Sequence, residues 1–277
     1  MIIVCEYDGI RFYGLREGAG SVIQYILSAF CFAQENGYKF AYLPSYNIGH
    51  FEHHQILPDE WDKSWNKYIY DNMIFDFSDL SGSDLPKKII TDLSSVESMK
   101  DLDVIVDLSD IRSKLIYTHP PCLMACLDKL RLKYAQNNLP CYFDQSKCNV
   151  AFHIRQFTST DGTNPDSSRD YFNMYQEQIS SFQSMMKWVK SQRQNVVFHI
   201  YSQGHPEKFK DFGDVILHLE EHPIISLHHM IKADILFMAA SSFSEIAATY
   251  SQGIKIIKPG FRRVTSDIIY FDPFISI

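Results

Sequence analysis

The 277-residue chain lacks the short motifs that mark several common enzyme classes. It has no GxxxxGKS or GxxxxGKT loop, no HExxH pair and no GxSxG turn, which argues against a P-loop kinase, a zinc protease and a serine hydrolase. Its six cysteines include no CxxC pair and stand mostly among apolar neighbours. We therefore expect free, buried thiols rather than a zinc cluster or a disulfide framework.

A surplus of basic residues and a long apolar run are also missing. The chain has 26 basic against 33 acidic residues, a formal charge of −7, which disfavours a general nucleic-acid binder. No apolar run approaches the roughly 20 residues that a membrane span needs, and the apolar start at residues 2–4 has no basic leader before it. We expect a cytoplasmic protein without a membrane span or a nucleic-acid partner.

What the sequence does have is hydrophobic content, 45% of its residues, enough for one large core or two modest ones. The N-terminal part begins with a strand pattern at residues 1–7, a glycine-bearing loop, and apolar residues at helical spacing over 21–36 that stop before Gly37. Residues 44–100 show no sustained periodicity. Further elements are expected at 40–43, 104–106 and 115–117 (strands) and at 121–135 (helix).

The C-terminal part alternates strand and helix patterns with short connections. Strands are expected at residues 149–154, 196–201, 215–219, 235–239 and 255–257. A long helix with one apolar face is expected around 172–189. This order is typical of a parallel, doubly wound sheet. The predicted fold is therefore α/β with two Rossmann-like domains, residues 1–147 and 148–277.

His153 and Arg155 come at the end of the first strand of the second domain. Ligands of open parallel sheets bind outside the carboxyl ends of the strands, so Arg155 stands where a pyrophosphate could lie and could bind its oxygens bidentately. An arginine paired with Asp161 or Asp166 is an equally good interpretation. For His153, a buried, hydrogen-bonded imidazole is at least as good an interpretation as a ligand contact.

A serine-rich segment follows the strand at 235–239 and begins a helix. It consists of Ser241, Ser242, Phe243, Ser244 and Glu245. Ser242 and Glu245 have capping-box spacing, and the helix N-terminus that they would fix is suited to phosphate. Capping alone explains an isolated match, but two anion-compatible segments at strand ends of one sheet favour a phosphate-binding site.

Residues after two other strands are expected to contact the nucleoside of a bound nucleotide. They are Ser202, Gln203, Gly204 and His218. Each of them, taken alone, is also explained as an ordinary polar or glycine residue of a loop between a strand and a helix.

His153-Ile154-Arg155 resembles the H-x-R motif of the fucosyltransferase superfamily, which includes α1,2-, α1,6- and protein O-fucosyltransferases. Residues 230–236 followed by Ser241–Ser244 resemble its later donor-binding motif, and residues 17–21 resemble its glycine-rich first loop. The resemblance implies the GT-B fold, in which two Rossmann-like domains face a cleft. It also implies inverting transfer without a metal or cofactor, from a nucleotide diphosphate sugar to a glycan acceptor, with Arg155 on the diphosphate.

The sequence departs from the family pattern at two places. Gln156-Phe157 follow the H-x-R where the family often has a further basic residue or Gly-Asp, and Ser21-Val22 replace its first-loop Asn-Gln. These departures argue against GDP-fucose as the donor more than they argue against nucleotide-sugar binding. A second resemblance is to small stand-alone glycosyltransferases of large algal viruses, with donors such as UDP-xylose.

Inverting transfer needs a base for the acceptor hydroxyl, which we expect from the N-terminal domain. Glu17, after the first strand, is the first candidate and Asp71 the second. A solvated or salt-bridged surface group is the ordinary interpretation of each. Other candidates that stay open are Glu6, Asp8, His50, His53 and His54.

Three other functions compete with this one. A metal-dependent GT-A enzyme needs a D-x-D after a strand, whereas Asp101-Leu102-Asp103 precedes an apolar run. A methyltransferase is disfavoured because residues 14–20 give no clean G-x-G-x-x-G. A non-catalytic nucleotide- or glycan-binding protein with a GT-B shell would have nearly the same sequence, and only turnover distinguishes it.

Overall fold

The computed structural model describes residues 1–8, 17–80, 83–111, 114–115, 120–156, 168–258 and 265–270, except for the side chains of 52–53, 120–122, 168–175 and 177. The chain forms two compact units, Met1–Asn138 and Leu139–Ile277. Unit 2 thus includes residues 139–147, which the sequence analysis assigned to the first domain. Among the described residues, no helix has the length and apolar character to cross a bilayer.

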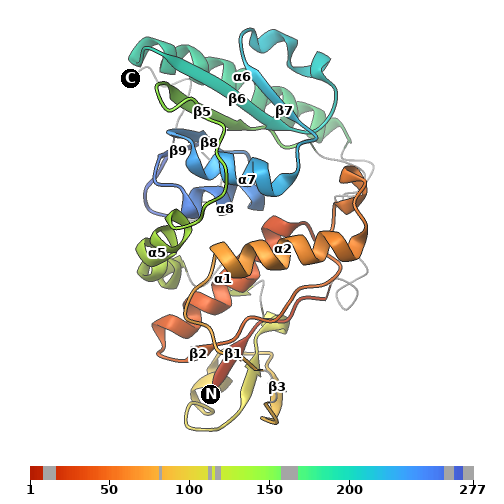
Figure 1. The fold of residues 1–277 in the computed structure, drawn as a ribbon, viewed down its shortest axis with the longest axis vertical. Coiled ribbons are helices and arrows are strands. Elements are labelled where there is room, and N and C mark those ends of the chain that lie inside the picture. The colour runs from red at the N-terminus through yellow and green to blue at the C-terminus, as the bar shows by residue number, and fades with distance from the viewer. Residues whose placement is uncertain are drawn as a thin grey trace. The chain divides into compact units, whose positions relative to one another are not determined.

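Unit 1 contains a four-stranded parallel sheet in the order β2-β1-β4-β3 (Figure 1). Its strands are β1 (Ile2–Val4), β2 (Lys39–Phe40), β3 (Lys87–Ile89) and β4 (Ile105–Asp107). Its helices are α1 (Ala19–Glu35), α2 (Pro58–Asn72), α3 (Ser94–Glu97) and α5 (Pro120–Ala135), with 3-10 turns η1 (Phe51–His54) and η2 (Ser109–Ile111). Helix α1 connects β1 to β2 and packs against α5.

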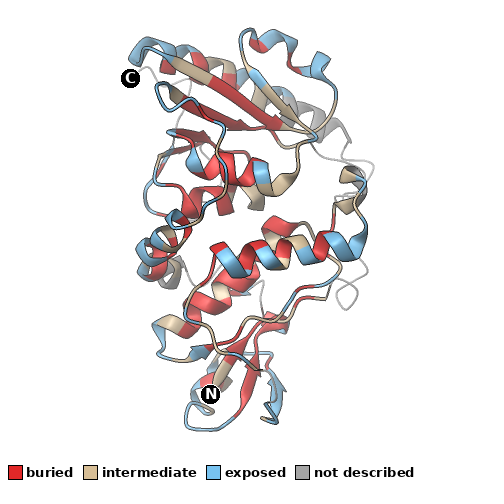
Figure 2. Ribbon diagram, viewed as in Figure 1, coloured by how far each residue is buried: buried red, intermediate tan, exposed pale blue. Residues whose placement is uncertain are grey.

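The sequence analysis missed α2, although the helix carries its own signals. Pro58 occupies its first turn, where a missing amide proton costs nothing, and two acidic residues follow it. The buried side chains recur at helical spacing, and the alternation of buried and exposed turns is visible in Figure 2. They are Trp61, Asp62, Trp65, Tyr68, Ile69 and Asn72. Aromatic rings carry much of this pattern.

Unit 2 contains a six-stranded parallel sheet in the order β10-β9-β8-β5-β6-β7. Its strands are β5 (Cys148–His153), β6 (Val196–Ser202), β7 (Ile216–Leu219), β8 (Ile235–Phe237), β9 (Ile254–Ile257) and β10 (Ile268–Tyr270). Its helices are α6 (Ser168–Gln192), α7 (Pro223–Lys232) and α8 (Ser242–Tyr250), with a 3-10 segment η4 (Pro206–Phe212). The strand order reverses between β5 and β8, which is the switch point of a doubly wound sheet.

The two faces of this sheet differ in character. On one face, Val150 and Phe152 of β5 pack with Phe182 of α6 in an apolar core. On the other face, Asn149 and His153 alternate with them along β5, and the neighbouring strands add further polar side chains. Helices α7 and α8 cover this polar face, as Figure 1 shows. A sheet with a polar covered face must provide partners for every buried polar group.

The predicted fold class is confirmed, because both sheets are parallel and flanked by helices. One predicted strand, 115–117, is wrong in its described part, since Leu115 is helical; residues 116–117 lie outside the described residues. Strand β10 was not predicted. The cysteines at 5, 31, 126, 141 and 148 are thiols and not disulfides, as expected, although the last two are partly exposed; the side chain of Cys122 lies outside the described residues.

Gly253 tests the packing of the turn between α8 and β9 against the turn between α7 and β8. A Cβ atom at this position would lie 2.2 Å from the carbonyl oxygen of Ala233 and 2.7 Å from that of Asp234. We expect Gly253→Ala to lower the free energy of unfolding by about 1–3 kcal/mol, because backbone must move. Denaturant titration measures this change. The control is Gly37→Ala, which meets open space but has φ of +69°, and should cost about 1 kcal/mol. A loss at Gly253 that is smaller than the loss at Gly37 would contradict the predicted clash.

Candidate functional site

The two motifs singled out in unit 2 meet at the switch point of its sheet. His153 ends β5, and Ser244 lies in the first turn of α8, which follows β8. The His153 Nδ1 atom lies 2.5 Å from Ser244 Oγ, and the same hydroxyl accepts the amide proton of Ala239 at 3.1 Å. This hydroxyl therefore links the end of β5, the end of β8 and the start of α8.

His153 is neutral in this position. Its side chain is almost fully buried, and its ring lies 5.6 Å from the ring of Phe243. Burial, and then the positive charge of Arg155, lower the pKa of His153 to about 3. The geometry is that of a buried, hydrogen-bonded imidazole, one of the two interpretations of this residue. It holds the neighbouring segments rather than facing an open site.

Arg155 and the N-terminus of α8 lie at the same edge of the sheet, because the carboxyl ends of parallel strands meet there. Arg155 follows β5 directly, is partly exposed, and donates its backbone N–H to Gln178 Oε1 at 3.3 Å. Helix α8 has nine residues, and its N-terminus adds a positive dipole end. A guanidinium and a helix N-terminus are a suitable pair for a diphosphate.

The predicted capping box of α8 is wrong by one residue. Ser241, not Ser242, is the N-cap: its backbone is extended and its Oγ accepts the N–H of Phe243 at 3.3 Å. Ser242 is the first helical residue, so Glu245 is the fourth rather than the third. Adjacent serines made the two registers indistinguishable in sequence. The helix begins where predicted, and only the capping residue changes.

Ser202, Gln203 and Gly204 form a second connection at this edge, between the ends of β6 and β5. The Ser202 hydroxyl donates to the carbonyl oxygen of Ile154 at 2.8 Å, and Gln156 Nε2 donates to the carbonyl of Gln203. Gly204 has φ of +95°, and a Cβ there would lie 3.0 Å from the Gln156 amide. The loop thus needs glycine, and it lies beside the segment that carries Arg155.

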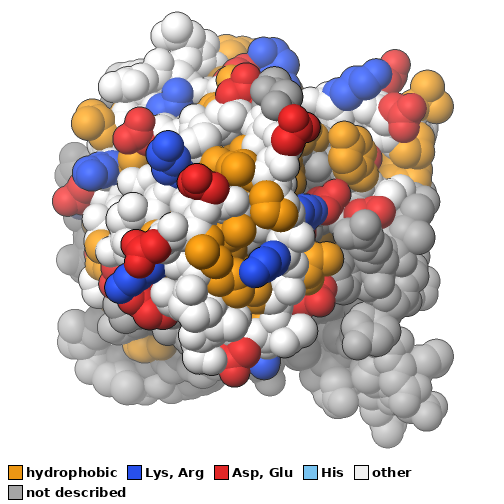
Figure 3. Space-filling view, turned by 90° about the horizontal axis from the view of Figure 1, so that it is seen from below, with side chains coloured by type: hydrophobic (Ala, Val, Ile, Leu, Met, Phe, Trp, Pro, Cys, Tyr) orange, Lys and Arg blue, Asp and Glu red, His pale blue; other side chains and the backbone are white. Residues whose placement is uncertain are grey.

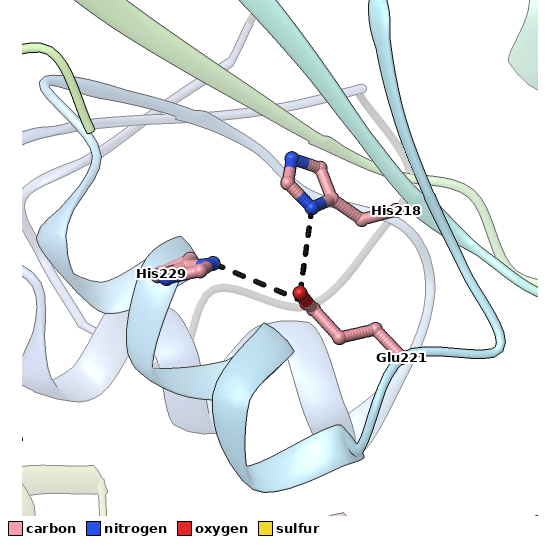
Figure 4. Close-up of side chains that lie close together, drawn as sticks. All are labelled: His218, Glu221 and His229. Carbon is pink, nitrogen blue, oxygen red and sulfur yellow. Dashed lines mark ion pairs between the residues drawn. The ribbon is translucent and has the colours of Figure 1, made fainter. Parts of the chain in front are cut away.

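His218 belongs to a different group of side chains, on the part of the polar face under α7. It lies in β7, stacks on Tyr201 with ring centroids 4.4 Å apart, and faces Glu221. His218 and Glu221, together with His229 of α7, could hold a metal ion (Figure 4). The sequence analysis missed His229, because its partners come from a strand and a turn rather than from one motif. The only signal was the three-residue spacing of His218 and Glu221.

Glu17 lies between β1 and α1, at the carboxyl edge of the sheet of unit 1. Its carboxylate accepts the phenol proton of Tyr25, and its backbone N–H donates to the hydroxyl of Tyr7 at 2.9 Å. The two tyrosine rings stack 6.4 Å apart. The ring of His50, one of the alternative bases, lies against Gly18. Glu17 is thus half-buried and held from several sides.

The other acidic candidates of unit 1 have different surroundings. Asp71 lies in the last turn of α2, exposed, with Lys67 Nζ 2.6 Å from its carboxylate. Glu6 pairs with Lys87 at 2.5 Å. Asp8 accepts a hydrogen bond from the side-chain amide of Asn47 at 3.0 Å. Exposed pairs such as that of Asp71 contribute little stability.

The remaining residues singled out in the sequence are two histidines, the D-x-D match and two aspartates. The ring of His54 stacks on Trp61 at 5.2 Å, and the side chain of His53 lies outside the described residues. Residues 101–103, the D-x-D match, form an exposed turn and bend, as the sequence indicated. Asp161 and Asp166, alternative partners of Arg155, also lie outside the described residues.

Surface features give two further points. A hollow lined by Lys147, Asn195, Val196 and Asp214, among others, lies at the amino ends of β5, β6 and β7, opposite the edge where doubly wound sheets bind ligands. On the face drawn in Figure 3, acidic and basic side chains are interspersed, with hydrophobic groups between them. No basic patch of the kind that binds nucleic acid is visible among the coloured side chains of that view.

Comparison with known proteins gives structural similarity only. No family model matches the sequence, and no curated protein matches it. The fold is similar to fucosyltransferase NodZ from Bradyrhizobium, at 11% identity and a TM-score of 0.43, over 90% of this chain and 92% of that chain. It is also similar to E. coli heptosyltransferase WaaC with ADP-2-deoxy-2-fluoro heptose, at 11% identity and a TM-score of 0.41, over 98% and 93%.

The neutral state of His153 predicts a pH dependence of stability. Its pKa is about 3 in the folded chain and 6.5 as the ordinary value, so below pH 6.5 the unfolded chain binds a proton that the folded chain does not. Stability from this residue is therefore complete above pH 7 and falls by up to about 2 kcal/mol between pH 7 and pH 5. Denaturant titrations at both pH values measure the loss. His153→Asn, which keeps an acceptor for Ser244, should lose less over the same range, and an equal loss in both chains would refute the assignment.

Proposed function

We propose that the chain is an inverting, metal-independent glycosyltransferase of GT-B architecture, which moves a sugar from a nucleotide diphosphate sugar to a glycan acceptor. One observation carries the proposal: Arg155 and the N-terminus of α8 follow the two strands that flank the switch point of unit 2. The hydroxyl of Ser244 links the two segments through His153.

The chemistry of diphosphate departure explains why these groups are suitable. As the glycosidic bond to the donor breaks, negative charge accumulates on the leaving diphosphate. A guanidinium fork and helix amide dipoles stabilise that charge without added Mg²⁺ if they are fixed beforehand. The buried, neutral His153 supplies such fixation, because it ties β5 to α8 without adding a charge of its own.

The nucleoside is proposed to lie along the loop after β6. Ser202 and Gln156 hold this loop to the segment that contains Arg155, and Gly204 gives the loop its turn with a positive φ beside the Gln156 side chain. The base and the sugar of the donor stay open between GDP-fucose, which the family resemblance favours, and another donor such as UDP-xylose. Nucleotide binding to the purified chain decides between them.

Glu17 is the proposed base that accepts the proton of the acceptor hydroxyl. Its carboxylate is positioned by Tyr25 and its backbone by Tyr7, so its geometry is defined, as general-base catalysis requires. Asp71, the second candidate, pairs with Lys67 and lies on an exposed helix face. The structure of unit 1 thus favours Glu17, and kinetics must separate the two.

The diphosphate assignment is tested with Arg155→Ala. Loss of a charge-assisted, bidentate contact should weaken binding of the matching nucleoside diphosphate by about 10- to 100-fold, while the fold persists because the side chain is partly exposed. Isothermal titration with UDP, GDP and ADP in EDTA measures the affinity. The matched control is Arg193→Ala, an exposed arginine just before β6 at the opposite end of the strands. Unchanged affinity in folded Arg155→Ala would reject the site.

The base assignment is tested with Glu17→Gln and Asp71→Asn. Glu17→Gln should leave donor affinity unchanged and lower the rate of sugar transfer by about 10²- to 10⁴-fold, the usual contribution of a general base. Asp71→Asn should retain most activity. Single-turnover transfer with radiolabelled donor gives the rates. Full activity of Glu17→Gln would exclude it as the base, and donor binding without any turnover in the wild-type chain would favour the non-catalytic binding protein.

A further inference from the structure

Three side chains on the polar face of unit 2 converge on one point, apart from the proposed diphosphate site. His218 comes from β7, Glu221 from the turn after it, and His229 from α7. Glu221 Oε1 lies 3.5 Å from His218 Nδ1, and Glu221 Oε2 lies 3.9 Å from His229 Nδ1. One ligand atom from each of the three residues lies within 4.8 Å of the others. Figure 4 shows both imidazoles directed toward the carboxylate.

A chain of hydrogen bonds determines which nitrogen of His218 carries a proton. The Asn149 amide donates to the carbonyl oxygens of Asp144 and Lys147, so its Oδ1 is left to accept from His199 Nε2 at 3.3 Å. His199 is buried, and when neutral its Nδ1 accepts from His218 Nε2 at 3.0 Å. A neutral His218 then has a bare Nδ1, and this atom faces Glu221.

An unprotonated imidazole nitrogen and a carboxylate oxygen both present lone pairs and repel each other. A positive charge between them would remove this repulsion. It is either a proton on His218 or a metal ion. His229 distinguishes these two possibilities. Its side chain is 1% exposed, and neither of its ring nitrogens has a hydrogen-bond partner among the described residues. A proton on His218 leaves His229 unsatisfied, at a cost for each buried polar atom, whereas a metal ion would bind its Nδ1 as well.

We propose that His218, Glu221 and His229 bind a divalent transition-metal ion such as Zn²⁺. Two imidazole nitrogens and one carboxylate are a common ligand set for zinc. The hydrogen-bond chain through His199 to Asn149 is the outer shell that orients a metal-binding imidazole and fixes its tautomer.

The ion would join β7 to α7, two elements that Glu221 and its neighbours connect in sequence. It would bind His218, which the sequence analysis assigned to the nucleoside, and would leave Arg155 and α8 to the diphosphate. The inference is therefore independent of the proposed function. A chain that transfers sugar without added Mg²⁺ can still contain this ion, because it lies apart from the leaving group.

The experiment measures zinc in the full chain after loading with Zn²⁺ and dialysis against metal-free buffer. We expect about one zinc ion per chain and a melting temperature about 5 °C higher than in the EDTA-treated protein. Glu221→Gln has nearly the same shape without the charge and should lose the ion. The matched control is His205→Ala, an exposed histidine outside the group, which should retain it. Equal zinc content in wild type and Glu221→Gln, or no zinc in either, overturns the proposal.

The visible spectrum of the Co²⁺-loaded wild-type chain gives a test that does not depend on any variant folding. Ligand-field bands of four- or five-coordinate cobalt without a thiolate charge-transfer band are expected from two histidines and a carboxylate. A thiolate band would assign the ion to a cysteine instead, and the spectrum of free aqueous Co²⁺ would show that no site exists. Either result overturns the proposal.

Discussion

The hydrogen bond between His153 and Ser244 is the contact on which the proposed donor site depends. It joins residues 91 positions apart in sequence, one at the end of β5 and one in the first turn of α8. It is a side-chain link between the segment that carries Arg155 and the N-terminus of the helix, which follow two neighbouring strands. Because the Ser244 hydroxyl also accepts the Ala239 amide, the turn between β8 and α8 is held by the same atom. Such fixation is what electrostatic stabilisation of a leaving group requires.

This contact is one instance of a wider constraint on unit 2. The apolar face of its sheet packs against α6, while the face under α7 and α8 buries histidines, an asparagine and a tyrosine. Each buried polar group needs a partner, and most have one: His153 has Ser244, and His199 has Asn149 and His218. The two ring nitrogens of His229, however, have no hydrogen-bond partner in the described part of the chain. An unpartnered imidazole beside a carboxylate is the place where a ligand is expected.

The sequence predicted those parts of the fold that depend on local periodicity. Alternating strands and helices in the C-terminal part, the glycine stop after α1 and the start of α8 all follow from neighbours along the chain. Helix α2 was missed because its buried face is built from aromatic rings within a stretch rich in charged residues. The cap of α8 was displaced by one because two adjacent serines have the same capping chemistry, and only backbone geometry distinguishes Ser241 from Ser242.

For a site assembled from different elements, prediction from the sequence depends on sheet topology and not on local periodicity. The contact between His153 and the serine-rich segment at the start of α8 could be predicted. The carboxyl ends of neighbouring parallel strands always lie together, and each motif lies at the end of such a strand. His218 and His229 could not be paired in this way, since the angle at which α7 crosses the sheet is set by packing and not by sequence spacing. The same reasoning ranks the acidic residues of unit 1. Glu17 lies just before α1, the helix that follows β1, and is held by tyrosines, whereas Asp71 projects from an exposed helix turn, so sheet topology favours Glu17 as the residue positioned for chemistry.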